Sequence, residues 1–125
     1  MRRERGSAVV DFVLVMVLLV PLVLGIVQLG LVLHVRNTLT AAASDGARAG
    51  APLGATPEDA KVWTRRMITD SLSARFARSV SATRTPVDGA PAVVVRVRAR
   101  VPALGVLGPG VPLDVRGRAL VQVEP

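Results

Sequence analysis

The chain has 125 residues, half of them hydrophobic, and a formal net charge of +7. It contains no cysteine and a single histidine, His34, which excludes disulfides, thiolate metal sites and multi-histidine metal centres. The positive charge is almost wholly arginine, with Lys61 the one lysine, and fits either a solvated basic surface or contact with a polyanion or anionic lipid.

A long apolar segment follows a short basic leader at the N-terminus. Between Ala8 and Leu33 the only polar side chains are Asp11 and Gln28, and a helix of this length can cross a hydrocarbon core about 30 Å thick. The arginines before it predict a single-pass protein of the cell membrane, with its N-terminus cytoplasmic and the remainder extracytoplasmic. A rival prediction is a cleaved secretory signal ending at Ala43, although the apolar run is longer than such signals require.

Asp11 lies inside the apolar segment, where an isolated carboxylate is disfavoured. Cleavage between Gly6 and Ser7 would create a new amine at Ser7, with Asp11 one helical turn away on the same face. A carboxylate at this place can pair with the terminal amine of a neighbouring subunit, and the pair would offset the desolvation of both groups. The alternative is an interfacial carboxylate that stays hydrated at the membrane edge.

The helix is predicted to continue beyond the membrane, because residues 34–50 are rich in alanine and contain no proline. Small residues recur there at helical spacing and allow close helix packing. They predict packing either between subunits of an assembly or onto the chain's own head. These helix-packing residues are Ala43, Gly46, Ala47 and Gly50.

A second helix is predicted to start at Thr56, which fits an N-cap, with Pro57 in the first turn and Asp59 at the capping-box position. Apolar residues follow at roughly helical spacing and predict its core-facing stripe. They are Ala60, Trp63, Met67, Leu72, Phe76 and Val80.

The apolar period then changes to two. Residues 93–101 alternate between apolar and largely arginine positions, which predicts a half-buried strand with a basic outer face. A turn is expected at residues 86–91, a partner strand near 79–85, an irregular loop at 102–112 and further alternation through Val123. The whole predicts an α+β fold, with a small antiparallel sheet packed against one or two helices.

The arginines of the outer face form a candidate basic partner surface. No aromatic side chain interleaves them, which argues against base stacking and hence against nucleic acid as the first choice. A solvated strand face, an acidic partner, lipid headgroups and DNA all remain open. The surface comprises Arg96, Arg98, Arg100, Arg116 and Arg118.

The sequence offers no phosphate-binding glycine loop of the usual spacing and no nucleophile linked to His34. We therefore expect a protein that is not an enzyme, with no catalytic residues, no metal, no cofactor and no small-molecule substrate.

The N-terminal motif of Gly6, Ser7, Asp11 and Phe12 resembles the class III signal of type IV pilin-like proteins, with aspartate in place of glutamate and phenylalanine in place of tyrosine. Residues 35–39 and 42–48 are similar to segments typical of TadE-like proteins of the tight-adherence (Tad/Flp) pilus. The last residues, 111–125, are loosely similar to that family's final strand.

The resemblance implies a minor pilin or pseudopilin that assists pilus assembly and surface adhesion, associates with other pilus-system subunits, and is cut by a prepilin peptidase after Gly6. It also implies a division into a cytoplasmic leader (1–6), a transmembrane helix with its extension (7–51) and a pilin-like α+β head (52–125). The alternative is a membrane-tethered basic module that binds an extracellular polyanion such as DNA.

Overall fold

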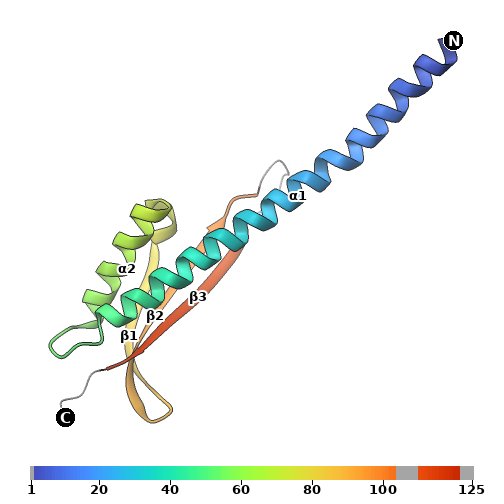
Figure 1. Ribbon diagram of the computed structural model, residues 1–125. Helices are drawn as coiled ribbons and strands as arrows, with labels where there is room; N and C mark the ends of the chain where they lie inside the picture. The colour runs from blue at the N-terminus through green and yellow to red at the C-terminus, as the bar shows by residue number, and fades with distance from the viewer. Residues whose placement is uncertain (1, 104–109, 122–125) are drawn as a thin grey trace.

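The computed structural model describes residues 2–103 and 110–121, with side chains from Glu4 onwards. Along the chain lie α1 (Arg2–Ala49), α2 (Pro57–Ser71), the short 3-10 helix η1 (Ala74–Ala77), β1 (Ser79–Val87), β2 (Ala90–Val101) and β3 (Val111–Leu120). The strands form one antiparallel sheet in the order β1-β2-β3, and both long helices pack on the same face of it (Figure 1). The predicted α+β fold is confirmed.

Helix α1 has two halves with opposite environments. Its 48 residues extend for about 72 Å, and the N-terminal half projects away from the rest of the molecule (Figure 1). Most large apolar side chains between Val9 and Leu33 are exposed, whereas Val35 and Leu39 are fully buried in the core. One unbroken helix therefore provides both the apolar projection and a layer of the head.

The junction between these halves is marked by Gln28. Its side-chain Nε2 donates a hydrogen bond to the carbonyl oxygen of Pro102, just after β2, at 3.1 Å. This contact joins the end of the sheet to the helix where the apolar projection stops, and it satisfies the one amide side chain of the segment. The part of α1 that packs on the sheet thus begins near Gln28.

Helix α2 begins as the sequence predicts. The Thr56 hydroxyl accepts a hydrogen bond from the Asp59 amide at 3.3 Å, and the Asp59 carboxylate accepts one from the Thr56 amide at 2.8 Å. Pro57 occupies the first turn, where its missing N–H costs nothing. The reciprocal bonds satisfy amide groups that the helix itself leaves free.

The predicted core role of Trp63 is wrong. Its side chain is 47% exposed, and the buried stripe of α2 is instead Ala60, Thr64 and Ile68. Ala60 and Thr64 of this stripe lie against Gly46 and Gly50 of α1, where the two helices come close together. Of the other predicted core residues, Ala60 and Val80 are buried, while Met67, Leu72 and Phe76 are partly buried against the core.

A two-residue turn joins β1 to β2. Asp88 and Gly89 both have positive φ, 52° and 82°, as a type I′ hairpin turn requires. The turn sets the register, so that Val80 lies opposite Val97 and both face the helices. Strand β3 begins at Val111, inside the loop predicted for 102–112; residues 104–109 of that loop, and Val123, lie outside the described residues.

The closest approach of helix and sheet involves Gly117 of β3. A Cβ atom there would overlap the backbone of Ala43 and Ser44 in α1. Two helix–helix contacts are similarly tight: a Cβ on Gly46 would overlap the Thr64 side chain, and one on Gly50 would lie 2.7 Å from the Ala60 Cβ. The absence of side chains at these glycines sets the spacing between the layers.

Gly117→Ala is expected to destabilise the head by about 1–3 kcal/mol, because the added methyl group meets rigid helix backbone and cannot be relieved by a rotamer change. The measurement is thermal unfolding of the full chain in detergent micelles. Gly30→Ala is the matched control, since nothing lies within 4 Å of the Cβ position there. Equal melting temperatures for the two variants would contradict the close-packing account.

Candidate functional site

The residues of the predicted processing and assembly motif lie on the free half of α1. Gly6, Ser7, Asp11 and Phe12 are all exposed, and Ser7 and Asp11 are one helical turn apart. Asp11 forms no hydrogen bond or ion pair with any residue that the structure describes. This end of the helix is accessible to another chain and independent of the head.

The helix-packing residues lie in the interior of the chain. Ala43 and Ala47 are fully buried, and Gly46 and Gly50 are buried beside α2. Their neighbours belong to α2, β2 and β3 of the same molecule. Close packing of small residues therefore occurs here between α1 and its own head.

The five arginines of the predicted basic surface share the sheet face that no helix covers. Arg96, Arg98 and Arg100 alternate along β2 with buried valines and a partly buried alanine, and Arg116 and Arg118 alternate along β3 with Gly117. Arg96 lies directly opposite Arg116 in the register, where like charges destabilise a strand pair. The fold thus concentrates positive charge on one open surface.

Asp114 is the one carboxylate on the strands of this face, and sequence analysis did not assign it a role. Arg96 Nε donates to Asp114 Oδ1 at 2.9 Å, and the same guanidinium makes a second bond to Oδ2. Arg98 approaches Oδ2 at 3.8 Å. The hydrogen bond from Arg96, followed by the charges of Arg96, Arg98 and Arg116, lowers the pKa of Asp114 below its ordinary value.

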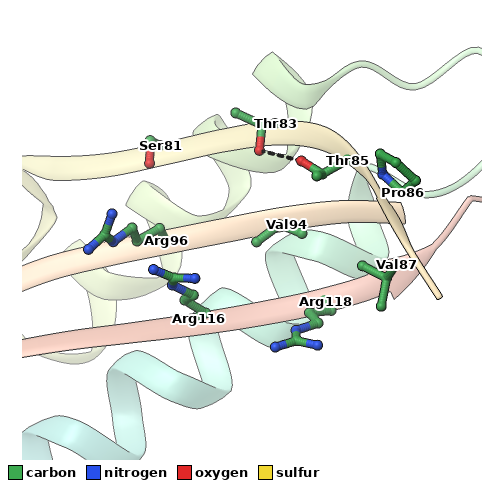
Figure 2. A pocket seen from close by; sticks show the side chains of 9 residues that line it. All are labelled: Ser81, Thr83, Thr85, Pro86, Val87, Val94, Arg96, Arg116 and Arg118. Atoms are coloured by element: carbon green, nitrogen blue, oxygen red, sulfur yellow. Dashed lines mark hydrogen bonds between the residues drawn. The ribbon is translucent and has the colours of Figure 1, made fainter. Parts of the chain in front are cut away.

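A shallow hollow of about 510 Å³ lies on the same face. Figure 2 shows Arg96, Arg116 and Arg118 on β2 and β3, with the hydroxyls of Ser81, Thr83 and Thr85 along β1. Thr83 Oγ1 and Thr85 Oγ1 are 3.3 Å apart and share a hydrogen bond. The hydroxyl row was missed in the sequence, although serine and threonine at every second position of residues 79–85 indicate a polar strand face.

The comparison with known families concerns α1. Residues 6–48 match the model of the TadE-like protein family. The resemblance to TadE-like proteins seen in the sequence is therefore confirmed for this segment.

The TadE-like match covers nearly all of α1 and ends before α2. The loose similarity of residues 111–125 to the family's last strand stays a prediction. No curated protein and no solved structure matches the chain. Within the described residues, α1 is the one helix long and apolar enough to cross a membrane. None of its most apolar stretch is buried in the rest of the molecule, which fits a single-pass membrane protein.

The pairing of Asp114 predicts a pH-dependent contribution to stability. Because its pKa is lowered on folding, the contribution is complete above the ordinary aspartate pKa of about 3.9 and is lost as the pH falls through the lower folded-state value. Asp114→Asn should therefore melt below the parent chain at neutral pH, by a small margin that narrows below about pH 4. Melting temperatures across this range test it.

Asp88→Asn removes one negative charge from the hairpin turn, at a positive-φ position that asparagine tolerates. It controls for the change in net charge. The prediction is contradicted if the difference in melting temperature between Asp114→Asn and the parent chain stays constant down to pH 2. It is also contradicted if that difference equals the one for Asp88→Asn at every pH. Either result would show that the bond to Arg96 does not stabilise the fold.

Proposed function

We propose that this chain is a minor pilin or pseudopilin, a structural component without catalytic activity that assists assembly of a tight-adherence pilus and surface adhesion. The observation that carries the proposal is the TadE-like match over residues 6–48, which coincides with a long helix whose apolar N-terminal half has no partner layer in the head. An exposed apolar helix of this kind needs lipid or other apolar helices around it.

The membrane placement follows from the exposed stretch of α1. Residues 8–27 would extend for roughly 30 Å as a helix, the thickness of a hydrocarbon core. Arg5 and the preceding arginines flank one end, and the head begins at the other near Gln28. The positive-inside rule then favours a cytoplasmic leader (1–6), a transmembrane helix with its extracytoplasmic extension (7–51) and an extracytoplasmic domain (52–125).

The core composition argues against a conventional secretory signal cut after Ala43. Such a cut would remove Val35, Leu39 and Ala42, all of which are buried in the core of the head. Losing several buried apolar side chains at once exceeds the stability margin of a small domain. A cut after Gly6 leaves the core complete, because every core residue that the structure describes lies after it.

In this proposal a prepilin peptidase cleaves between Gly6 and Ser7. Asp11, about one turn inside the apolar stretch, then pairs with the Ser7 amine of a neighbouring subunit in the membrane. A carboxylate at the bilayer centre costs about 2.5–3.5 kcal/mol on insertion scales, and less near the edge. Pairing offsets this cost and fixes the axial register between the two helices.

The processing step predicts that the mature chain from cells containing a prepilin peptidase starts at Ser7. Intact-mass spectrometry of the membrane fraction should show the loss of residues 1–6, and deletion of the peptidase gene should restore the full-length mass. A chain that keeps residues 1–6 in cells with the active peptidase would overturn the processing proposal. A chain starting at Ser44 would instead establish secretion.

The pairing step predicts that Asp11→Ala inserts into the membrane as well as the parent chain, or better, but loses most of its association with other Tad subunits. Removing one charge of a buried pair leaves the other uncompensated. The measurement is cross-linking and co-purification from membranes, normalised to the amount of inserted protein. Asp11→Glu is the matched control and should retain association; normal association of Asp11→Ala would exclude the pairing.

A further inference from the structure

The open face of the sheet carries an excess of positive charge that the chain does not neutralise. This face holds five arginines and the single carboxylate Asp114, which Arg96 engages through two hydrogen bonds. Within the part of the chain that the structure describes, Arg116 and Arg118 have no ion-pair partner. Both are exposed, and Arg116 lies opposite Arg96, so the fold retains a repulsion that a bound anion would relieve.

The two arginines of β3 leave the strand on the open face. Arg116 and Arg118 are two residues apart, so their Cα atoms are about 7 Å apart along β3, and Figure 2 shows Arg116 leaning towards Arg96 and Arg118 away from it. Across the shallow hollow, Ser81, Thr83 and Thr85 repeat at the same interval along β1 (Figure 2). Two parallel rows of donors, one cationic and one neutral, therefore line a surface with Val94 between them.

Guanidinium forks and hydroxyls are both donors to phosphate oxygens, and the planar fork matches phosphate with two hydrogen bonds. A repeating row of such donors suits a repeating row of phosphates more than a single anion. The hollow lies on the uncovered side of the sheet, opposite the helices, so a long polymer can cross it without meeting the helical layer.

Two other ligand classes fit less well. An extended acidic peptide lying on a sheet face finds no backbone partners for its own amides, because those of the sheet are exposed only at its edges. Single-stranded nucleic acid gains much of its affinity from stacking on aromatic side chains, and the strands of this face contain none.

We propose that the open face of the sheet, centred on Arg116, Arg118 and the hydroxyls of Ser81 and Thr83, binds the phosphate backbone of double-stranded DNA without reading its base sequence. This activity is additional to the proposed pilus role. Its contacts lie on the head, away from the exposed segment that holds Gly6 and Asp11, so either proposal can fail while the other stands.

The test uses the full chain in nanodiscs of zwitterionic lipid, titrated into labelled duplexes of two unrelated sequences. Both duplexes should bind with equal affinity. The double variant Arg116→Gln/Arg118→Gln should bind on the order of tenfold more weakly at about 0.1 M salt, and the slope of log affinity against log salt should fall by about 2. Arg116→Lys/Arg118→Lys should fall between the two, because lysine keeps the charge but not the fork.

The matched control is Arg65→Gln/Arg66→Gln. It removes the same charge from exposed positions of α2, on the helical side of the sheet, and should leave affinity within about twofold. If both double variants lose the same affinity for duplex DNA, binding reflects only the net charge of the protein, and the proposed site is wrong. No duplex binding, tighter binding of single strands, or equal competition by polyglutamate would each overturn the phosphate-backbone assignment.

Discussion

The molecule depends on the close contact between α1 and the layers beneath it. The helix that forms the apolar projection also belongs to the helical layer over the sheet, and it can lie so close to β3 and α2 because Gly117, Gly46 and Gly50 have no side chains. The short distance between the layers places Leu39 and Val35 in one buried cluster with the valines of β2. A head of this size has little other apolar surface to bury, so the anchor helix and the fold form one structural unit.

Much of this architecture is visible in the sequence, because its signals are local. The capping box of Thr56 and Asp59, the alternation along residues 93–101 and the Asp88-Gly89 turn each specify nearby backbone geometry. The exposure of Trp63 depends instead on tertiary packing, because α1 lies against the neighbouring face of α2, at Ala60 and Thr64. The pairing of Arg96 with Asp114 likewise depends on strand register, which alternation alone leaves undetermined.

The two candidate sites also differ in how much of each can be predicted from the sequence. The motif around Asp11 is contiguous and can be recognised from residues 6–12, but its chemistry involves a second chain. The arginines could be assigned to a basic face from their alternation, whereas their neighbours could not. Only the three-strand register places Arg116 opposite Arg96 and sets the hydroxyls of β1 across from them. On that face Arg96 and Arg116 bring like charges opposite each other, and Asp114 compensates them only in part.

The continuity of α1 from Arg2 to Ala49 has a mechanical consequence. Because the helix is unbroken between the exposed apolar half and the core, a tilt of the apolar half relative to a membrane moves the packed half sideways. The stretch from Gln28 to Ala49 is roughly 32 Å long, so a tilt of about 20° sweeps its tip sideways by roughly 11 Å. Extraction of the helix from lipid along its axis would move the head outward by as much as the helix itself moves.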